Sequence, residues 1–168
     1  HFEIDFEAPK LPAIPCKLIV HAIKAEKVRK MDASSSDPYL TLQLKGDPDS
    51  LMKTKVIKND LNPVWNQTFE FYCKDWNTDT LLVNMWDKDI KNDDKMMNEL
   101  ELPLNKWPID GSTITFEDDI KLKKKDAGRL YLEFQVQPVS SSQPQSDTVA
   151  PKSPAKPRVD VKIKRGYP

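Results

Sequence analysis

The stretch Leu130-Tyr131-Leu132-Glu133-Phe134-Gln135-Val136 places an apolar side chain at every second position. Side chains that alternate in this way point to opposite faces of a β-strand, so that one face packs on a core and the other meets water. Residues 38–44, with the sequence Pro-Tyr-Leu-Thr-Leu-Gln-Leu, repeat the pattern. Both stretches therefore predict strands of a sheet that has one buried face.

The same period of two recurs through most of residues 1–137, and turn-forming residues separate the runs. Further alternating or strand-sized apolar runs occur at residues 2–6, 17–25, 69–73, 81–86 and 100–104. No segment shows an amphipathic helical stripe over three turns. We therefore predict an all-β fold, an eight-stranded antiparallel Greek-key β-sandwich.

Composition and charge exclude several classes of protein. The chain has 168 residues with 26 basic and 26 acidic side chains, and this balance does not support a globally basic nucleic-acid binder. No apolar run approaches the roughly 18 residues that a membrane-spanning helix needs. Cys16 and Cys73 belong to no Cys-x-x-Cys pair, which favours buried thiols in a reducing compartment. The chain begins at His1 rather than Met, which indicates a fragment or a processed form.

Composition changes at Pro138, and from there to the end of the chain there are six prolines and one aromatic residue. Such a segment cannot bury enough apolar surface to offset its ordering entropy. We therefore divide the chain into an N-terminal extension (1–15), a folded domain (16–137) and a disordered basic tail (138–168). Within the tail, Pro151-x-x-Pro154-x-Lys156 has the spacing of a ligand for an SH3-type partner, a spacing that Pro- and Lys-rich linkers also produce by chance.

Carboxylates cluster in two gaps that follow predicted strands. These acids are Asp32, Asp37, Asp87, Asp89, Asp93 and Asp94. If both gaps lie at one end of the sandwich, the carboxylates face one another, and two such charges about 4 Å apart repel by about 4 kcal/mol. A bound cation relieves this repulsion, and a flexible set of oxygen ligands suits Ca²⁺ better than Mg²⁺.

Acid-rich loops of this kind also occur in turns without metal and in EF-hands. Aspartate is favoured in turns because it hydrogen-bonds the local backbone, so acid-rich loops are common in proteins that bind no metal. This interpretation stays open. An EF-hand loop beginning at Asp87 is rejected, because Lys91 stands at its fifth position and Asn98 replaces the bidentate Glu.

The order of the motifs resembles the C2 domain, the calcium- and phospholipid-binding sandwich of protein kinase C and synaptotagmins. The matching series consists of Leu18-x-Val20, Ser36-Asp37-Pro38-Tyr39-Leu40, the segment from Asn62 to Phe71, and Trp86-Asp87-x-Asp89. Residues 59–71 are most similar to cytosolic phospholipase-type C2 domains. This similarity implies the circular permutation in which residues 17–25 form the first strand, while the alternation from Phe2 to Phe6 leaves the other permutation open.

The resemblance also implies a set of calcium ligands. Asp32 and Asp37 match the first-loop aspartates of the family, Asp87 and Asp89 match the paired third-loop aspartates, and Asn59 matches a ligand of phospholipase-type members. Lys95 falls where many members have their last aspartate, so we expect Asp93 or Asp94 to substitute. Ca²⁺ is therefore the implied cofactor, and the number of ions stays open.

Side chains near the acids provide the expected membrane contacts. Loop carboxylates complete only part of a calcium shell of about six to eight oxygens, so lipid phosphates are expected to complete it. Met31 and Met96 are expected to insert into the membrane, whereas Met97 is expected in the core. Lys53, Lys55 and Lys58 match a strand that often binds phosphoinositides in C2 domains; alternatively, they protect an edge strand from aggregation.

These features predict a non-enzymatic, calcium-dependent phospholipid-binding module that is cytoplasmic and is recruited to membranes as a peripheral protein. The alternative is a calcium-independent adaptor that uses the lysines and the tail to bind a protein or a phosphoinositide. An enzyme is disfavoured, because the sequence offers no plausible Ser/His or Cys/His pair with an orienting acid and no glycine-rich phosphate loop.

Overall fold

The structure is a computed structural model that describes residues 12–32 and 35–139. The alternation from Phe2 to Phe6, the tail from residue 140 onwards and the motif Pro151–Lys156 lie outside the described residues, so the predictions about them stay untested. Within the described part of the chain, no helix is long and apolar enough to cross a bilayer.

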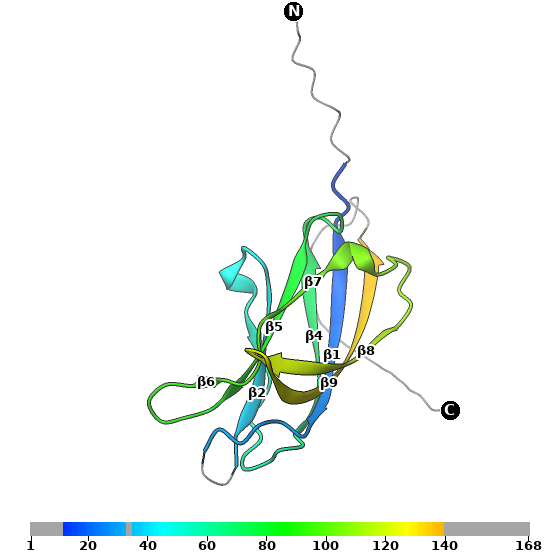
Figure 1. Cartoon of the computed structure of the whole chain (residues 1–168). Coiled ribbons are helices and arrows are strands. Elements are labelled where there is room, and N and C mark those ends of the chain that lie inside the picture. Colours follow the sequence, from blue (N-terminus) through cyan, green and yellow to red (C-terminus); the bar gives the residue numbers. More distant parts are fainter. Residues whose placement is uncertain (1–11, 33–34, 140–168) are drawn as a thin grey trace, which may run out of the picture. The chain divides into compact units, whose positions relative to one another are not determined.

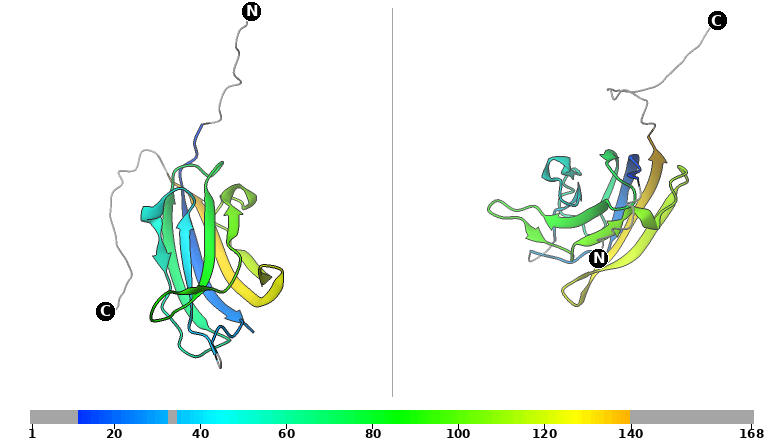
Figure 2. Two further views of the ribbon diagram at one scale, coloured as in Figure 1. Left: turned by 60° about the vertical axis from the view of Figure 1, so that its left-hand side comes forward. Right: turned by 90° about the horizontal axis from the view of Figure 1, so that it is seen from above.

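Nine antiparallel strands in the described residues form two facing sheets (Figures 1 and 2). Sheet A has the order β4-β1-β9-β8 and contains β1 (Cys16–Glu26), β4 (Val64–Cys73), β8 (Ile114–Leu122) and β9 (Lys125–Pro138). Sheet B has the order β3-β2-β5-β6, with β7 also paired to β5. It contains β2 (Pro38–Leu44), β3 (Met52–Lys53), β5 (Thr80–Asp87), β6 (Asp94–Lys95) and β7 (Leu100–Pro103). Two short 3₁₀ turns are η1 (Pro48–Ser50) and η2 (Leu104–Lys106).

This arrangement confirms the predicted antiparallel sandwich, with β1 as the first described strand, where the phospholipase-type permutation expects it. The structure has nine strand segments where eight were predicted, and two of the nine, β3 and β6, are only two residues long.

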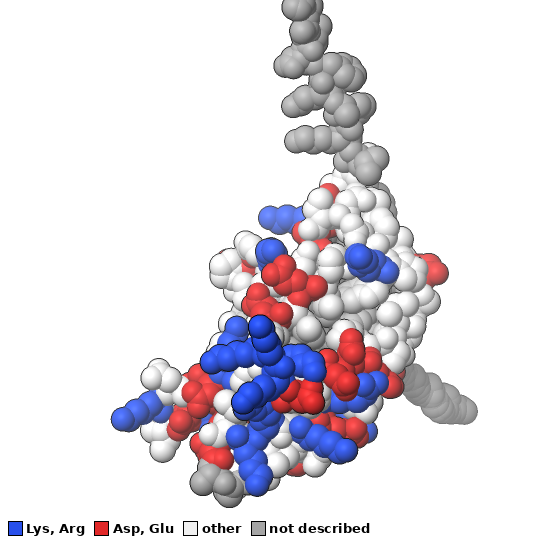
Figure 3. All heavy atoms as spheres, in the orientation of Figure 1, with Lys and Arg blue, Asp and Glu red and all other residues white. Residues whose placement is uncertain are grey.

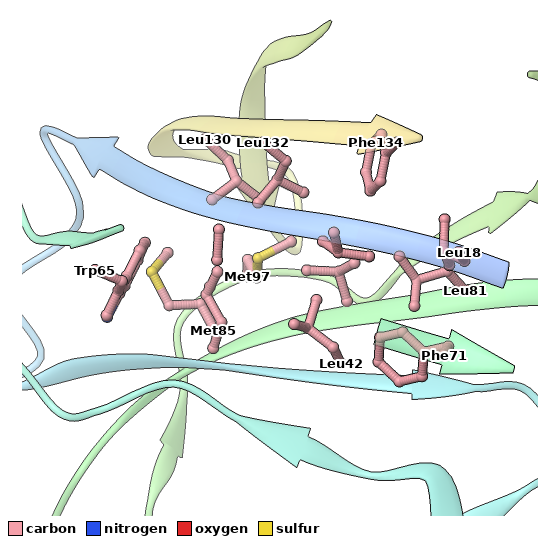
Figure 4. Close-up of a cluster of buried hydrophobic side chains, with 14 of the residues drawn as sticks. Leu18, Leu42, Trp65, Phe71, Leu81, Met85, Met97, Leu130, Leu132 and Phe134 are labelled. Atoms are coloured by element: carbon pink, nitrogen blue, oxygen red, sulfur yellow. The ribbon is translucent and has the colours of Figure 1, made fainter. Parts of the chain in front are cut away.

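The core lies between the two sheets because the apolar faces predicted from the alternation point towards each other. Figure 4 shows Leu18 from β1, Phe134 from β9, Leu42 from β2 and Leu81 from β5 in this space. All four side chains are at most 1% exposed. Burial of a side chain of this size contributes about 1.5–3 kcal/mol, so these facing rows hold the sheets together.

Three loops that are distant in the sequence meet at one end of the sandwich. We call this end the acidic rim and define it as residues 27–32, 35–37, 58–63 and 87–94. Three backbone hydrogen bonds connect the loops: from Val28 N–H to Leu61 O, from Asp60 N–H to Ser36 O and from Lys88 N–H to Asp37 O, each of 3.0 Å. The strand ends therefore place the acids of both predicted gaps at the same end.

The other end of the sandwich, which we call the opposite pole, is where β1 begins and β4 ends. Cys16 and Cys73 are register partners there. Just beyond this pair, Trp76 N–H donates to Ile14 O at 2.8 Å. β1 runs from this pole to Glu26 beside the acidic rim, so the two ends are separated by the length of the strand.

Candidate metal and membrane site

Asp87, the last residue of β5, carries a deeply buried carboxylate that is 1% exposed. Alternation along β5 points it to the same side as the core residue Met85. Its Oδ1 accepts the backbone N–H of Asp37 at 2.7 Å, whereas its Oδ2 is buried without a hydrogen-bond partner among the described residues. Burial raises the pKa of Asp87, the hydrogen bond from Asp37 lowers it, and the charges of Asp32, Asp37 and Asp94 raise it further. An unpaired buried oxygen of this kind is costly unless a ligand compensates it.

Asp37 is hydrogen-bonded both to Asn59 and to Asp87. The Oδ1 of Asp37 accepts the backbone N–H of Asn59 at 2.7 Å. Asn59 has a φ of 52°, a left-handed conformation that asparagine tolerates better than most residues. Asp32 is exposed, and its backbone N–H donates to Ser35 O at 3.1 Å. The fold thus brings Asp32, Asp37, Asn59 and Asp87 to the same rim.

Asp93 and Asp94, the two candidates for the last ligand, lie on different faces of sheet B. Asp94 is the register partner of Asp87, so both side chains lie on the inner face. The Oδ2 of Asp93 instead accepts a hydrogen bond of 2.5 Å from the Tyr39 hydroxyl, and Lys88 Nζ lies 3.9 Å from the same oxygen. The hydrogen bond from Tyr39 lowers the pKa of Asp93, while burial and then this bond raise the pKa of Tyr39 to about 12. Asp94 therefore lies on the same face as Asp87, whereas Asp93 contacts Tyr39 and Lys88.

Residues 88–93 form a loop that projects beyond sheet B next to β6 (Figure 1). Asp89 makes local contacts in this loop: its N–H donates to Asp93 Oδ1 at 3.0 Å and its Oδ1 accepts Ile90 N–H at 2.6 Å. The neighbouring Ile90 is 98% exposed. Sequence reasoning missed Ile90, although a single isoleucine between Asp89 and Lys91 in an acidic loop was a usable signal.

The chemistry of this donor set fits a hard divalent cation. Asp87 offers an unpaired oxygen, and carboxylates of Asp32, Asp37 and Asp94 are close enough to raise its pKa. Over residues 12–32 and 35–139, no three His, Cys, Asp or Glu side chains are already gathered as a metal-binding group. Like charges hold such carboxylates apart until a cation compensates them. The rim therefore brings carboxylate oxygens near one another without a preassembled metal site in the described residues, and Asn59 contacts it through its backbone N–H.

The methionines behave differently from one another. The expectation that Met96 inserts into a membrane is wrong, because Met96 is 0% exposed and its N–H donates to Met85 O at 2.8 Å. Alternation from Asp94 turns Met96 towards the interior. The core position expected for Met97 is confirmed, since it is also 0% exposed. Met31 is partly buried against the core, and its insertion stays a prediction.

The three candidate headgroup lysines do not share one face. Lys53 and Lys55 are exposed on either side of the buried Thr54, as a period of two predicts, and β3 is an edge strand of sheet B. Lys58 is exposed within the acidic rim, next to Asn59. Figure 3 shows basic side chains concentrated over the half of the sandwich that contains the rim, with acidic groups on either side. Both roles considered for these lysines stay predictions.

Comparisons with known proteins agree with this architecture. The sequence profile of the C2 domain matches residues 16–119. A protein of Arabidopsis thaliana named "Calcium-dependent lipid-binding protein" is 36% identical over 124 residues, which cover 69% of this chain and 24% of that relative. Tricalbin-1 of Saccharomyces cerevisiae is 32% identical over 127 residues, which cover 72% of this chain and 10% of that relative. The chain thus spans a quarter or less of the length of these curated relatives.

Solved structures show the same fold. A single C2 domain of plant Extended Synaptotagmin 1 has a TM-score of 0.66 and 26% identity, and the match covers 79% of this chain and 100% of that one. Human GIVD cytosolic phospholipase A2 in complex with methyl gamma-linolenyl fluorophosphonate has a TM-score of 0.66 and 25% identity, with 76% of this chain and 18% of that chain covered. The phospholipase match therefore concerns a small part of that enzyme.

Proposed function

The chain belongs to the C2 domain family, and from this premise we propose that it is a calcium-dependent phospholipid-binding module. Its acidic rim holds Ca²⁺ against the phosphate of a lipid headgroup. The observation that carries the proposal is the buried, unpartnered Oδ2 of Asp87, surrounded by the charges of Asp32, Asp37 and Asp94. The name of the Arabidopsis relative supports the same combination of calcium and lipid.

The residues of the rim divide the work of binding. Asp87 and Asp94 supply carboxylates from adjacent strands, and Asp32 and Asp37 supply them from the first loop. When bound, calcium supplies positive charge and further coordination positions that phosphate oxygens fill. Neutralising the rim also removes its repulsion from an anionic bilayer. Metal and membrane therefore strengthen each other's binding, as linkage requires.

In this proposal Ile90, rather than the buried Met96, inserts into the membrane. It is 98% exposed in the loop that also carries Asp89, so its burial in the membrane interface requires no rearrangement of the core. Transfer of such a side chain from water is worth about 1.5–3 kcal/mol. The module acts in this proposal as a peripheral protein recruited from the cytoplasm to a membrane, with no catalytic step of its own.

Sedimentation with vesicles tests the proposal. Vesicles of phosphatidylserine and phosphatidylcholine should bind the chain at least about tenfold more tightly with free calcium than with chelator. Asp87→Asn should remove the calcium-dependent part. Asp49→Asn is the matched control, because Asp49 is an exposed aspartate in η1, away from the rim. Binding that is unchanged by chelator and by Asp87→Asn would contradict the proposal.

A second candidate function is calcium-independent binding of an anionic headgroup by the edge of sheet B. Lys53 and Lys55 are both exposed there, and neither amine forms an ion pair with a carboxylate of the described residues. Replacing both with glutamine should weaken binding to phosphoinositide vesicles in chelator. Replacing Lys74 and Lys106, exposed near the opposite pole, makes the same charge change as a control. Equal binding by the two double variants would eliminate this function.

A further inference from the structure

Cys16 and Cys73 face each other across the β1–β4 ladder at the opposite pole. Cys16 is the first residue of β1, Cys73 is the last residue of β4, and the two are direct register partners. Directly opposed residues of antiparallel strands have Cα atoms about 4.5–5.5 Å apart. A disulfide spans Cα separations of about 4.4–6.8 Å. The backbone therefore already meets the main requirement for a bridge.

Both side chains also lie on the same face of sheet A. Cys16 is 1% exposed and Cys73 is 4% exposed, and the alternate residues Leu18 and Phe71 are buried in the core as well. Both cysteines are free thiols. A hydrogen bond with Cys73 lowers the pKa of the Cys16 thiol although burial opposes this, and the same contact raises the pKa of Cys73. The contact between the two thiols therefore favours the thiolate on Cys16, with Cys73 beside it.

We propose that Cys16 and Cys73 are a modification site, a thiol pair that hydrogen peroxide converts to a reversible cross-strand disulfide. The Cys16 thiolate sulfur attacks one peroxide oxygen, so that an S–O bond forms, the O–O bond breaks and hydroxide leaves. The sulfur of Cys73 then attacks the sulfur of Cys16. The S–S bond forms, the S–O bond breaks, and the oxygen leaves as water with the proton of Cys73. In total, two thiols lose two electrons and one peroxide is reduced to two waters.

The position of the pair gives a small oxidant a route to it. Cys16 and Cys73 form the last pair of the β1–β4 ladder, and β4 is one of the two edge strands of sheet A, so a brief local opening beside this pair would admit a small oxidant. Two hydrogen bonds join the segment before β1 to the segment after β4: Ile14 N–H donates to Asp75 Oδ1 at 3.1 Å, and Trp76 N–H donates to Ile14 O at 2.8 Å. These bonds keep the thiols near each other while water and peroxide enter.

The bridge has a predictable effect on the domain. It closes a long loop of the unfolded chain between β1 and β4, which should raise the Tm by about 5–15 °C. The acidic rim lies at the other end of β1, so calcium-dependent vesicle binding should be unchanged. The inference is therefore independent of the proposed function, and either one can fail alone.

Peptide mapping of the full chain tests the inference. The folded protein is treated with hydrogen peroxide, unreacted thiols are blocked, and tryptic peptides are analysed without reductant. A peptide that links Cys16 to Cys73, that disappears with dithiothreitol and is accompanied by the higher Tm, is the expected result. In Cys73→Ser, Cys16 should instead be trapped as sulfenic acid by dimedone, and in Cys16→Ser the yield of sulfenic acid should fall several-fold.

Three outcomes would overturn the inference. These are thiols that react only after denaturation, products that link two copies of the chain, and direct oxidation of either cysteine to sulfinic acid without a linked peptide. The decisive map uses the wild-type chain, so it remains valid even where a serine variant fails to fold.

Discussion

At the scale of single residues, Asp87 is both a buried residue of the sandwich and the main proposed calcium ligand. The strand alternation that buries Met85 also buries the Asp87 carboxylate, and the backbone of Asp37 satisfies only one of its oxygens. The neighbouring negative charges oppose ionisation further. The calcium-free protein therefore carries a local destabilisation, which a cation would remove.

Replacing Asp87 with asparagine should raise the unfolding free energy of the calcium-free protein by about 1 kcal/mol. Asparagine keeps an oxygen for the N–H of Asp37 and removes the charge. The gain should shrink at low pH, because the raised pKa makes wild-type stability fall as pH rises above the ordinary aspartate value of 3.8. Chemical denaturation in chelator measures this. A less stable Asp87→Asn protein in chelator would show that the carboxylate is compensated without metal.

Ile90→Ser should weaken binding to phosphatidylserine vesicles about tenfold at saturating calcium, because the burial of one isoleucine is lost. Stability should not change, since the side chain is 98% exposed. Tyr72→Ser is the control, an exposed apolar residue on β4 near the opposite pole that is 71% exposed. Wild-type affinity in Ile90→Ser would remove this residue from the membrane contact.

The sequence predicted which loops carry the acids but not which side chains converge. Asp93 and Asp94 are adjacent and chemically identical, and the parity of the short strand β6 decides that Asp94 faces Asp87 while Asp93 faces Tyr39. The same parity buries Met96. β6 has only two residues, and an alternation that short cannot be recognised in a sequence. Which of the two aspartates faces Asp87 therefore follows only from the pairing of β6 with β5.

At the scale of elements, the two residues that follow the exposed strand β6 form part of the core rather than a free loop; they are Met96 and Met97. Met96→Ala should lower the unfolding free energy by about 2–5 kcal/mol, because it leaves a cavity beside Met85. Urea denaturation measures the loss. Vesicle affinity per folded molecule should be unchanged. Weaker vesicle binding at unchanged stability would restore Met96 as an inserting residue.

β9 supports the first acidic loop through a close approach at Gly128. A Cβ placed there would lie 2.6 Å from Glu26 O, and the φ of Gly128 is +115°. Gly128→Ala should therefore cost about 2 kcal/mol or more in a thermal or urea melt. Gly46→Ala is the matched control, with a φ of +81° and no atom within 4 Å of the added Cβ, and should cost about 1 kcal/mol. Equal losses would show that β9 can move away from residue 26.

Strands with regular alternation were recognisable from sequence, and β8 was not. β2 was predicted at its observed bounds, residues 38–44. The alternation at residues 130–136 predicted only the second half of β9, which begins five residues earlier, at Lys125. In β8, the run Glu117-Asp118-Asp119 interrupts the apolar positions. β8 is an edge strand with only one neighbour, so its central acids can remain in solvent. Edge strands tolerate such interruptions of the apolar alternation, so they are harder to predict from sequence than central strands.

At the scale of the whole molecule, a net charge of zero conceals a concentration of both acidic and basic side chains in one half of the sandwich. Acidic side chains occupy the loops of the rim, and lysines gather over the same half of the sandwich (Figure 3). An anionic membrane would attract the lysines and repel the uncompensated rim. A cation at the rim changes the sign of one contribution without changing the fold, which is how the arrangement would depend on calcium.

The most direct measurement is a crystal structure of the chain soaked with Tb³⁺, a strong anomalous scatterer that shares the preference of calcium for oxygen ligands. We expect an anomalous peak at the rim, coordinated by Oδ2 of Asp87 and by carboxylates of Asp32, Asp37 and Asp94. A rim without a peak, or a Tb³⁺ ion bound elsewhere while Oδ2 of Asp87 stays without a metal contact, would contradict it.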